Sequence, residues 1–266
     1  MKRPEPSGYE NEPDEQFLPL PAGLYPSLFH QFNRDAEEER SWYLDILSTH
    51  PCKNILELGC GTGRICEYLQ GAGLNLFGID TSPEMLNFSR NSRFVPSSEM
   101  DMTRLGFKRF FDAALLPCNT LNLLQEKQVI NQCLSETRQV LRSPGLLILH
   151  LFVPDQNLIE NAGEKLFQFS LADRPDGGTV IRETIRSYDA GAQLLTLEER
   201  YKIRPSGNSG ERQNYLHTFQ LAAFPPSQWF AAIEEAGFSI IATSGRFDHS
   251  PFRERHTSTL LLVAGC

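Results

Sequence analysis

The sequence predicts an α/β protein with a doubly wound, mostly parallel seven-stranded sheet and a small antiparallel β insert after the fifth strand. Between 54 and 153, short apolar runs alternate with amphipathic segments of helical period, which is typical of parallel strands joined by helices. After 153 the pattern changes to strand-like alternation, and the strand–helix rhythm returns from 225 onward.

The N-terminal region divides at Gly23. Prolines and acidic residues dominate before it and leave little apolar surface to bury, so 1–22 is expected to be a flexible arm, either a free tail or loosely docked. Apolar residues then recur at helical spacing over 24–32 and again over 42–47, which predicts two helices, the second ending before Pro51. Glu37-Glu38-Glu39 is interpreted as a charged helix start, favourable near the positive dipole end, that needs no function.

The first half of the sheet starts with a short apolar run over 54–58. Glycines follow this run directly, which predicts a buried strand that ends there. Ser82 is a candidate N-cap, with Pro83 at the tolerated first helical position. Ser143-Pro144-Gly145 breaks the longest helix. The other elements predicted here are helices over 64–70, from 82 onward and over 125–141, and strands over 74–79, 94–99, 111–116 and 146–151.

The second half begins with the insert, over 154–224. Segments 179–188 and 193–203 alternate and meet near Asp189-Ala190-Gly191, which predicts a β-hairpin, and 212–221 is a candidate third antiparallel strand. The α/β pattern then resumes with a helix over 227–236 and strands over 239–243 and 257–263. We therefore expect a single domain over 23–266 that carries a β-rich insert.

Composition and charge exclude several classes of protein. Lys and Arg number 25 against 33 Asp and Glu, for a formal charge of −8, which does not suit binding to nucleic-acid phosphates. No window approaches the roughly 20 apolar residues that cross a bilayer, and the start of the chain does not resemble a signal peptide. Six cysteines without a C-x-x-C pair indicate a reduced, cytoplasmic protein with no zinc site. A homodimer stays open.

A glycine-rich turn follows the first predicted strand, with Gly59, Gly61 and Gly63 at every second position. Glycine permits a tight turn and lets a ligand approach the backbone, and the helix that follows offers free N–H groups to an anion. Asp80 ends the second predicted strand, roughly 20 residues after the glycine turn. At about this spacing an acidic side chain binds ribose hydroxyls in nucleotide-binding folds. Together these features predict a nucleotide-type ligand.

Two ligand classes fit such a turn. A dinucleotide site has the pattern G-x-G-x-x-G, whereas this chain has Gly59-x-Gly61-x-Gly63 followed by Arg64. A dinucleotide also leaves unexplained why Glu57 stands two residues before the first glycine. The spacing therefore disfavours a nicotinamide cofactor.

Segment 55–64 resembles motif I of the class I S-adenosylmethionine-dependent methyltransferases, which is an acid, one residue and then G-x-G-x-G. The resemblance continues in order and covers about half of the chain, over 54–153 and from 225 onward. It departs at 140–145, where one extra serine and a single glycine stand in the turn before the fifth strand. The segments that resemble the family are Asp80 with 81–86, Asp101-Met102, 111–116, 140–145 and Gly237-Phe238.

The resemblance implies a Rossmann-like fold, S-adenosylmethionine as cofactor and S-adenosylhomocysteine as product. It also implies roles for particular residues. The backbone over 59–63, including Gly59, Cys60, Gly61 and Gly63, would cradle the methionine part, and Glu57 would orient the turn and the ligand ammonium through water. Asp80 would accept from the ribose hydroxyls, Asp101 and Met102 would bind the adenine, and Cys118 would line the floor near the sulfonium.

The acceptor is expected to be a small molecule. Nucleic-acid aminomethylases carry an aromatic N/D-P-P-Y/F/W motif after the fourth strand, where this chain has Leu116-Pro117-Cys118-Asn119-Thr120. The β-rich insert and the aromatic N-terminal helix resemble those of small-molecule N- and O-methyltransferases, such as amino-sugar N-methyltransferases. His150, at the carboxyl end of the fifth strand, is a candidate base. The candidates for the pocket wall are Tyr25, His30, Arg182, Tyr215 and His217, with ordinary packing as the alternative for each of these residues and for His150.

Three other functions stay open. A nicotinamide-dependent oxidoreductase is disfavoured by the glycine spacing. A catalytically silent methyltransferase-like subunit would keep the cofactor site without turnover. An aminopropyl-type transferase would need acidic residues after the fourth strand, where Pro117-Cys118-Asn119 supplies none.

Overall fold

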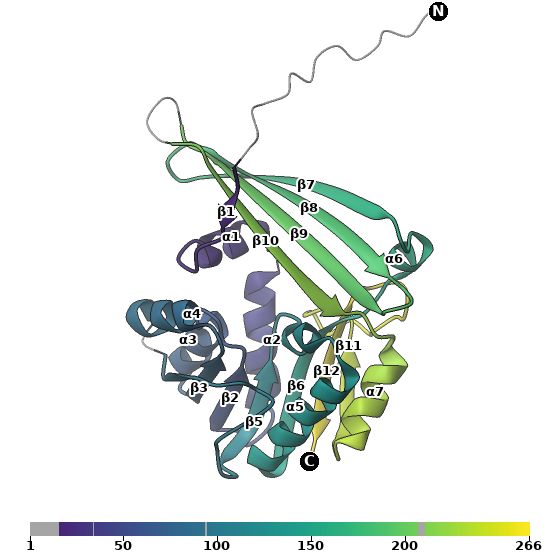
Figure 1. The fold of residues 1–266 in the computed structure, drawn as a ribbon. Coiled ribbons are helices and arrows are strands. Elements are labelled where there is room, and N and C mark those ends of the chain that lie inside the picture. Colours follow the sequence, from purple (N-terminus) through teal and green to yellow (C-terminus); the bar gives the residue numbers. More distant parts are fainter. Residues whose placement is uncertain (1–15, 34, 94, 207–210) are drawn as a thin grey trace, which may run out of the picture.

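The structure, a computed structural model, describes residues 16–33, 35–93, 95–206 and 211–266 (Figure 1). A seven-stranded sheet forms the larger layer of this part of the chain. Each neighbouring pair in it is parallel except at β12, which runs antiparallel to both of its neighbours. The predicted doubly wound sheet is therefore confirmed. Its strands lie in the order β11 (Ser239–Ser244), β12 (Thr259–Gly265), β6 (Leu141–Phe152), β5 (Phe111–Leu116), β2 (Asn54–Leu58), β3 (Asn75–Asp80) and β4 (Ser97–Glu99).

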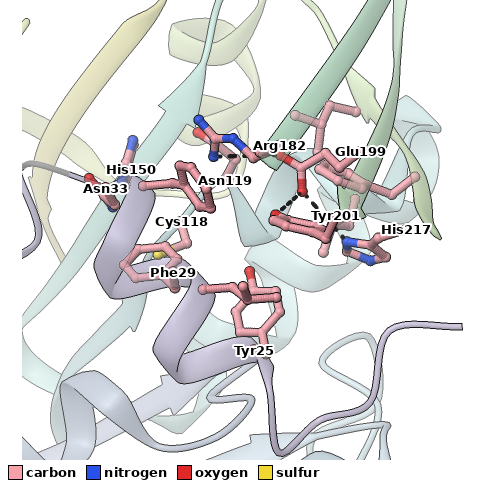
Figure 2. Close-up of a pocket in the computed structure, with 15 residues that line it drawn as sticks. Tyr25, Phe29, Asn33, Cys118, Asn119, His150, Arg182, Glu199, Tyr201 and His217 are labelled. Atoms are coloured by element: carbon pink, nitrogen blue, oxygen red, sulfur yellow. Dashed lines mark hydrogen bonds and ion pairs between the residues drawn. The ribbon is translucent and has the colours of Figure 1, made fainter. Parts of the chain in front are cut away.

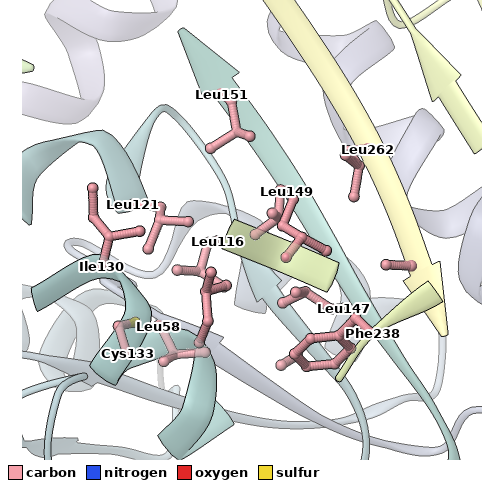
Figure 3. Close-up of a cluster of buried hydrophobic side chains, with 14 of the residues drawn as sticks. Leu58, Leu116, Leu121, Ile130, Cys133, Leu147, Leu149, Leu151, Phe238 and Leu262 are labelled. Carbon is pink, nitrogen blue, oxygen red and sulfur yellow. The ribbon is translucent and has the colours of Figure 1, made fainter. Parts of the chain in front are cut away.

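Helices cover both faces of this sheet because successive strand residues point to opposite sides. In β5, Ala114 and Leu116 join one buried cluster, whereas Ala113 and Leu115 join another. The first cluster (Figure 3) packs against α5 (Lys127–Val140) and α7 (Pro226–Glu235). The second packs against α2 (Ala36–Ser48), α3 (Arg64–Gly71) and α4 (Pro83–Phe88). Ser82 caps α4 as predicted, since its Oγ accepts the N–H of Met85 at 3.3 Å.

Two strand boundaries differ most from the predictions, those at the starts of β6 and β4. β6 begins at Leu141, directly after α5, and runs through the predicted break at Ser143-Pro144-Gly145. The extra residues fit because Phe111 pairs with Leu141 and the register then shifts before Ala113 pairs with Leu146. Phe94, where the third strand was expected to begin, lies outside the described residues.

A five-stranded sheet lies over one end of the seven-stranded sheet (Figure 1). The predicted hairpin and third strand are β8 (Thr179–Asp189), β9 (Leu194–Arg204) and β10 (Gln213–Ala222), all antiparallel. The structure adds β7 (Lys165–Asp173), which the sequence did not indicate, on the far side of β8. The short helix α6 (Gln156–Glu160) leads into β7. The antiparallel sheet expected after the fifth strand is therefore present.

The N-terminal segment contributes the last strand of this sheet. Residues 1–15 of the expected arm lie outside the described residues, but β1 (Leu18–Pro19) pairs in parallel with β10. The backbone N–H of Ala22 then donates to Glu84 of α4 at 2.9 Å. Residues 16–22 are thus docked rather than free, and they lead directly into α1 (Tyr25–Phe32), which lies between the two sheets (Figure 1).

The side chain of Asn122 connects the two sheets through hydrogen bonds. Asn122 belongs to a 3-10 turn, η2 (Thr120–Leu124), and is fully buried. Its Nδ2 donates to the carbonyl oxygens of Phe152 in β6 and Ala222 in β10, and its Oδ1 accepts the N–H of Phe152. A satisfied buried amide of this kind fixes the relative position of the strands that it joins. Within the described chain, no helix has the length and apolar character needed to span a membrane.

Candidate active site

The glycine turn between β2 and α3 leaves part of the backbone open to a ligand. Gly59, Gly61 and Gly63 have positive φ angles of 70°, 52° and 80°, which favour glycine. A Cβ atom on Gly59 would lie 2.4 Å from Cγ2 of Thr120, so the chain has no room there. On Gly61 the same atom would meet nothing within 4 Å. A ligand can therefore approach the peptide groups around Gly61.

Glu57 stands two residues before this turn, with 2% of its surface exposed. Burial raises the pKa of its carboxyl to about 7, although a hydrogen bond with Cys66 acts in the opposite direction. Its Oε2 has no hydrogen-bond partner among the described residues. Because an unpaired buried carboxylate oxygen is unfavourable, this arrangement suits a cationic group that a ligand brings.

Asp80 ends β3 on the opposite side of the turn. Its Oδ2 accepts the N–H of Gly61 at 2.8 Å, and its Oδ1 accepts the N–H of Ser82 at the same distance. These two bonds fix the carboxylate beside the open part of the turn. Each carboxylate oxygen keeps further acceptor capacity, so Asp80 can also accept hydrogen bonds from ligand hydroxyls.

A cavity of about 280 Å³, called here the first cavity, lies beside the turn. Gly63, Asp101 and Met102 do not line it, although they were assigned to the cofactor. Gly63 instead lets the start of α3 pack closely against Ser89, since a Cβ atom on Gly63 would lie 2.5 Å from Oγ of Ser89. The residues from the same assignment that do line it are Glu57, Gly59, Cys60, Gly61, Asp80 and Cys118.

Asp101 and Met102 have local partners instead. Oδ1 of Asp101 accepts the N–H and the hydroxyl of Thr103, both at 2.8 Å, which closes a turn. Met102 is partly buried against the larger core cluster. Their assignment to the adenine end stays a prediction.

A second cavity of about 390 Å³ lies under the five-stranded sheet (Figure 2). Tyr25, His150, Arg182 and His217 line it, and their roles toward an acceptor stay predictions. His30 does not line it, because it is exposed one step around α1 from Phe29, which faces the cavity.

Tyr215 also fails to reach the second cavity. It is buried in a separate cluster with Leu28 and Val180, and its hydroxyl donates to Gln213 at 3.2 Å. Tyr215 and His30 therefore do not line the second cavity, and their assignment to the pocket wall stays a prediction.

The two cavities meet at a shared wall, formed by Tyr25, Phe29, Cys118, Leu123 and His217. Cys118 and Asn119 follow β5 in the left-handed backbone region, with φ of 53° and 61°. For side chains other than glycine this conformation is strained, and such strain gathers at functional sites. This backbone conformation directs the side chain of Cys118 to the junction. Protein surrounds the thiol there, and both cavities border it.

Glu39, interpreted from the sequence as part of a charged helix start that needs no function, contacts several groups at this junction. Only 1% of its side chain is exposed. Its Oε2 accepts from Nη2 of Arg64 at 2.5 Å, its Oε1 accepts the thiol of Cys118 at 3.3 Å, and Nδ1 of His150 lies 3.7 Å from Oε1. Burial alone would raise the pKa of Glu39, but His150 and Arg64 outweigh burial and lower it. Glu39 is therefore an ionised carboxylate beside the imidazole.

The neighbouring groups stay in one protonation state. Burial and the nearby Glu39 raise the pKa of the Cys118 thiol well above its usual range, so Cys118 is neutral. Burial likewise raises the pKa of the Tyr25 hydroxyl, with Cys118 and Glu199 acting in the same direction. Both groups can donate hydrogen bonds, and neither is a nucleophile near neutral pH.

Glu199 is the second carboxylate that the sequence analysis missed. Its Oε2 accepts the hydroxyl of Tyr201 at 2.8 Å, and Nδ1 of His217 lies 3.9 Å from the same oxygen (Figure 2). Nη1 of Arg182 lies 3.9 Å from Oε1. Burial raises the pKa of Glu199, but these three neighbours together lower it below the usual value. An ionised carboxylate thus faces the second cavity.

Helix α1 is held between the two halves of the site by stacked arginines. The guanidinium of Arg64, at the start of α3, lies 4.2 Å from the ring centre of Phe29. The guanidinium of Arg182, on β8, lies 4.6 Å from that of Phe32. Such cation–π contacts are each worth about 0.5–2 kcal/mol. Among the described residues, no group of three or more His, Cys, Asp or Glu is placed to hold a metal ion.

Comparisons with known proteins point to methyltransferases. A family model described as a methyltransferase domain matches residues 56–149, which include the glycine turn, Asp80 and the strands on either side. A putative methyltransferase of Bacillus subtilis (strain 168), YqeM, is 25% identical over 198 residues, or 73% of this chain and 76% of that protein.

Two solved structures have the same fold. A S-adenosylmethionine-dependent methyltransferase from Clostridium acetobutylicum ATCC 824 has a TM-score of 0.77 at 14% identity and covers 91% of this chain and 98% of that one. CalS10 from Micromonospora echinaspora, an amino pentose methyltransferase involved in calicheamicin biosynthesis, has a TM-score of 0.72 at 20% identity and covers 96% and 99%.

Proposed function

Because the chain belongs to the class I S-adenosylmethionine-dependent methyltransferase family, we propose that it transfers a methyl group to a nitrogen or oxygen atom of a small molecule. One observation carries the proposal, which is the meeting of the two cavities at Cys118 and Tyr25. One cavity has the groups that the family's cofactor requires, and the other has groups able to bind a polar acceptor.

The residues of the first cavity fit the cofactor. The unpaired Oε2 of Glu57 would face its ammonium group through water, and the open backbone at Gly61 leaves space for its methionine part. Asp80 would bind the ribose hydroxyls. When bound, S-adenosylmethionine supplies a methyl group activated by a sulfonium. The protein then has to align the acceptor and exclude water.

The second cavity would hold the acceptor. Its volume of about 390 Å³ lies in the usual range for small-molecule sites. Glu199 can accept from an ammonium or hydroxyl group of the acceptor, and Arg182 can donate to an oxygen. Aromatic rings from α1 and the sheet would surround the apolar part. The acceptor of CalS10 is named as an amino pentose, which makes amino sugars the first class to test.

His150 is the proposed base, and Glu39 is its positioning residue. An ammonium group must lose its proton before methyl transfer and an alcohol before or during it, and an imidazole can accept that proton. The carboxylate of Glu39 near Nδ1 favours the proton on that nitrogen, which leaves Nε2 as the acceptor. Glu39 also stabilises the imidazolium that forms. The arrangement therefore supplies a base on the acceptor side of the junction.

The acidic chain and its free cysteines fit the rest of the proposal. A formal charge of −8 does not favour a nucleic-acid substrate, and six free thiols suit the reducing cytoplasm. The matched proteins named above are methyltransferases rather than nicotinamide-dependent oxidoreductases.

The test is an activity assay with methyl-labelled S-adenosylmethionine and a panel of amino sugars, other amines and hydroxylated small molecules. We expect label in at least one acceptor and stoichiometric S-adenosylhomocysteine, both strongly reduced in the His150→Ala variant. Cofactor binding without label in any acceptor would instead favour the silent subunit.

A further inference from the structure

Strand β7 is an unusually open sheet edge. Of the four sheet edges in the described chain, β4 has three residues, β1 has two, and β11 carries a register shift at Ile240/Ala242. Short or bulged edges of this kind discourage pairing with other chains. β7 instead has nine residues, no proline and a continuous register with β8, and no described strand lies on its other side. An edge without such protection is a template for strand addition.

The outer face of β7 carries a row of exposed apolar side chains. Phe167, Phe169 and Leu171 are 63%, 57% and 57% exposed, and alternate residues of a strand share one face. Leu166 points the other way and packs in a buried cluster with Tyr188. Exposed aromatic residues in such a row mark an interaction surface.

The sequence of β7 is self-complementary. A two-fold axis at Phe169 between antiparallel copies would bring Lys165 of one copy opposite Asp173 of the other, at both ends. The same axis sets Phe167 opposite Leu171 and Phe169 opposite itself. All five residues lie on one face, so each pair meets as cross-strand neighbours. Opposite charges at the two ends are what an antiparallel second copy needs, and an unrelated strand has no reason to match them.

We propose that the protein forms a homodimer in which β7 pairs antiparallel with β7 of a second copy about an axis at Phe169. The two five-stranded sheets then join into one continuous sheet. Backbone N–H and C=O groups of the open edges pair with each other, and the apolar rows of both copies form one patch. This surface lies outside both cavities, so its test is independent of methyl transfer.

The first experiment measures the mass of the full chain and of Phe169→Glu by size-exclusion chromatography with light scattering over a dilution series. We expect the wild type to have twice the chain's mass of 30.1 kDa. Phe169→Glu should have the mass of a single chain, because the variant places two carboxylates opposite each other at the axis. Ile241→Glu is the matched control, since Ile241 is 55% exposed on the bulged edge strand β11. It should stay dimeric.

A charge swap tests the register. Asp173→Lys places two lysines opposite each other at both ends and should weaken the dimer about tenfold. Adding Lys165→Asp to Asp173→Lys restores opposite charges and should restore the wild-type dissociation constant. Circular dichroism checks that each variant folds.

A monomeric wild type overturns the proposal. So does a folded Phe169→Glu that stays dimeric, because the interface then lies elsewhere. A double variant no tighter than Asp173→Lys alone overturns the register, and with it the proposed axis.

Discussion

Replacing Glu57 by glutamine should change how the stability of the free protein depends on pH. Burial raises the pKa of this carboxyl to about 7 from a usual value of 4.5, and its Oε2 has no partner among the described residues. Between these two pH values the folded protein binds more protons at this site than the unfolded chain does. Stability therefore falls as the pH rises through this window.

The pKa difference sets the size of the effect. At about 1.4 kcal/mol for each tenfold change in proton affinity, ionising Glu57 in the folded state destabilises it by about 3 kcal/mol. Well below pH 4.5 the carboxyl is neutral in both states and has no such effect. Glutamine has nearly the same shape and does not ionise, so the variant keeps the stability that the wild type loses.

Urea unfolding at several pH values from 4.5 to 8 measures this difference. The free energy of unfolding of Glu57→Gln, minus that of the wild type, should rise by about 3 kcal/mol across the range. Other titrating groups are common to both proteins and cancel in the difference. Parallel curves would show that Glu57 does not ionise in this window and would refute the reasoning.

The other predictions concern ligand binding, turnover and the glycine turn. Asp80→Ala should weaken S-adenosylmethionine binding by about 1.5–3 kcal/mol, measured by calorimetry, because it removes a charge-assisted acceptor for the ribose. His150→Ala should slow turnover about 10²–10⁴-fold, and Glu39→Gln less, with little change in cofactor affinity in either case. Gly59→Ala should lower the free energy of unfolding about 1–3 kcal/mol more than Gly73→Ala, because only the first Cβ meets a buried threonine.

Matched controls separate these effects from general damage. Gly73 has a φ of 88° and open space around it, so its alanine variant reports backbone strain alone. Glu38→Gln removes an exposed carboxylate next to Glu39 and should leave turnover unchanged. Turnover at the wild-type rate in His150→Ala would leave His150 as a packing residue. Unchanged cofactor affinity in a folded Asp80→Ala would remove Asp80 from the site.

Local pattern was enough to predict the central strands. β2 and β5 have the predicted bounds, Asn54–Leu58 and Phe111–Leu116, because both faces of these strands are largely buried and most of their residues are apolar. The glycine turn and Asp80 could be predicted for the same local reason. Their positions follow from the ends of adjacent parallel strands.

In the edge strand β7 the apolar residues face the opposite way from those of an ordinary half-buried strand. Its largest apolar residues, including Phe167 and Phe169, point outward, and the inward positions after Leu166 hold small or polar residues such as Ser170 and Ala172. The alternation that identifies a half-buried strand is therefore inverted. Its assignment needed the register with β8, which is a tertiary feature.

Glu39 had a signal in the sequence that the charged run obscured. It stands three and four residues before Trp42 and Tyr43, which puts it on the buried face of α2. An acid on an apolar stripe is rarely buried without a partner. Glu199 likewise stands two residues from Tyr201 and so shares its strand face. The partners of both acids come from distant segments, which only the fold brings together.

The most direct test of the account is calorimetric titration of the purified protein with S-adenosylmethionine, S-adenosylhomocysteine and NADH in parallel. We predict binding of both adenosyl ligands in the micromolar range and none of NADH. Binding of NADH alone would contradict the assignment of the first cavity and favour an oxidoreductase.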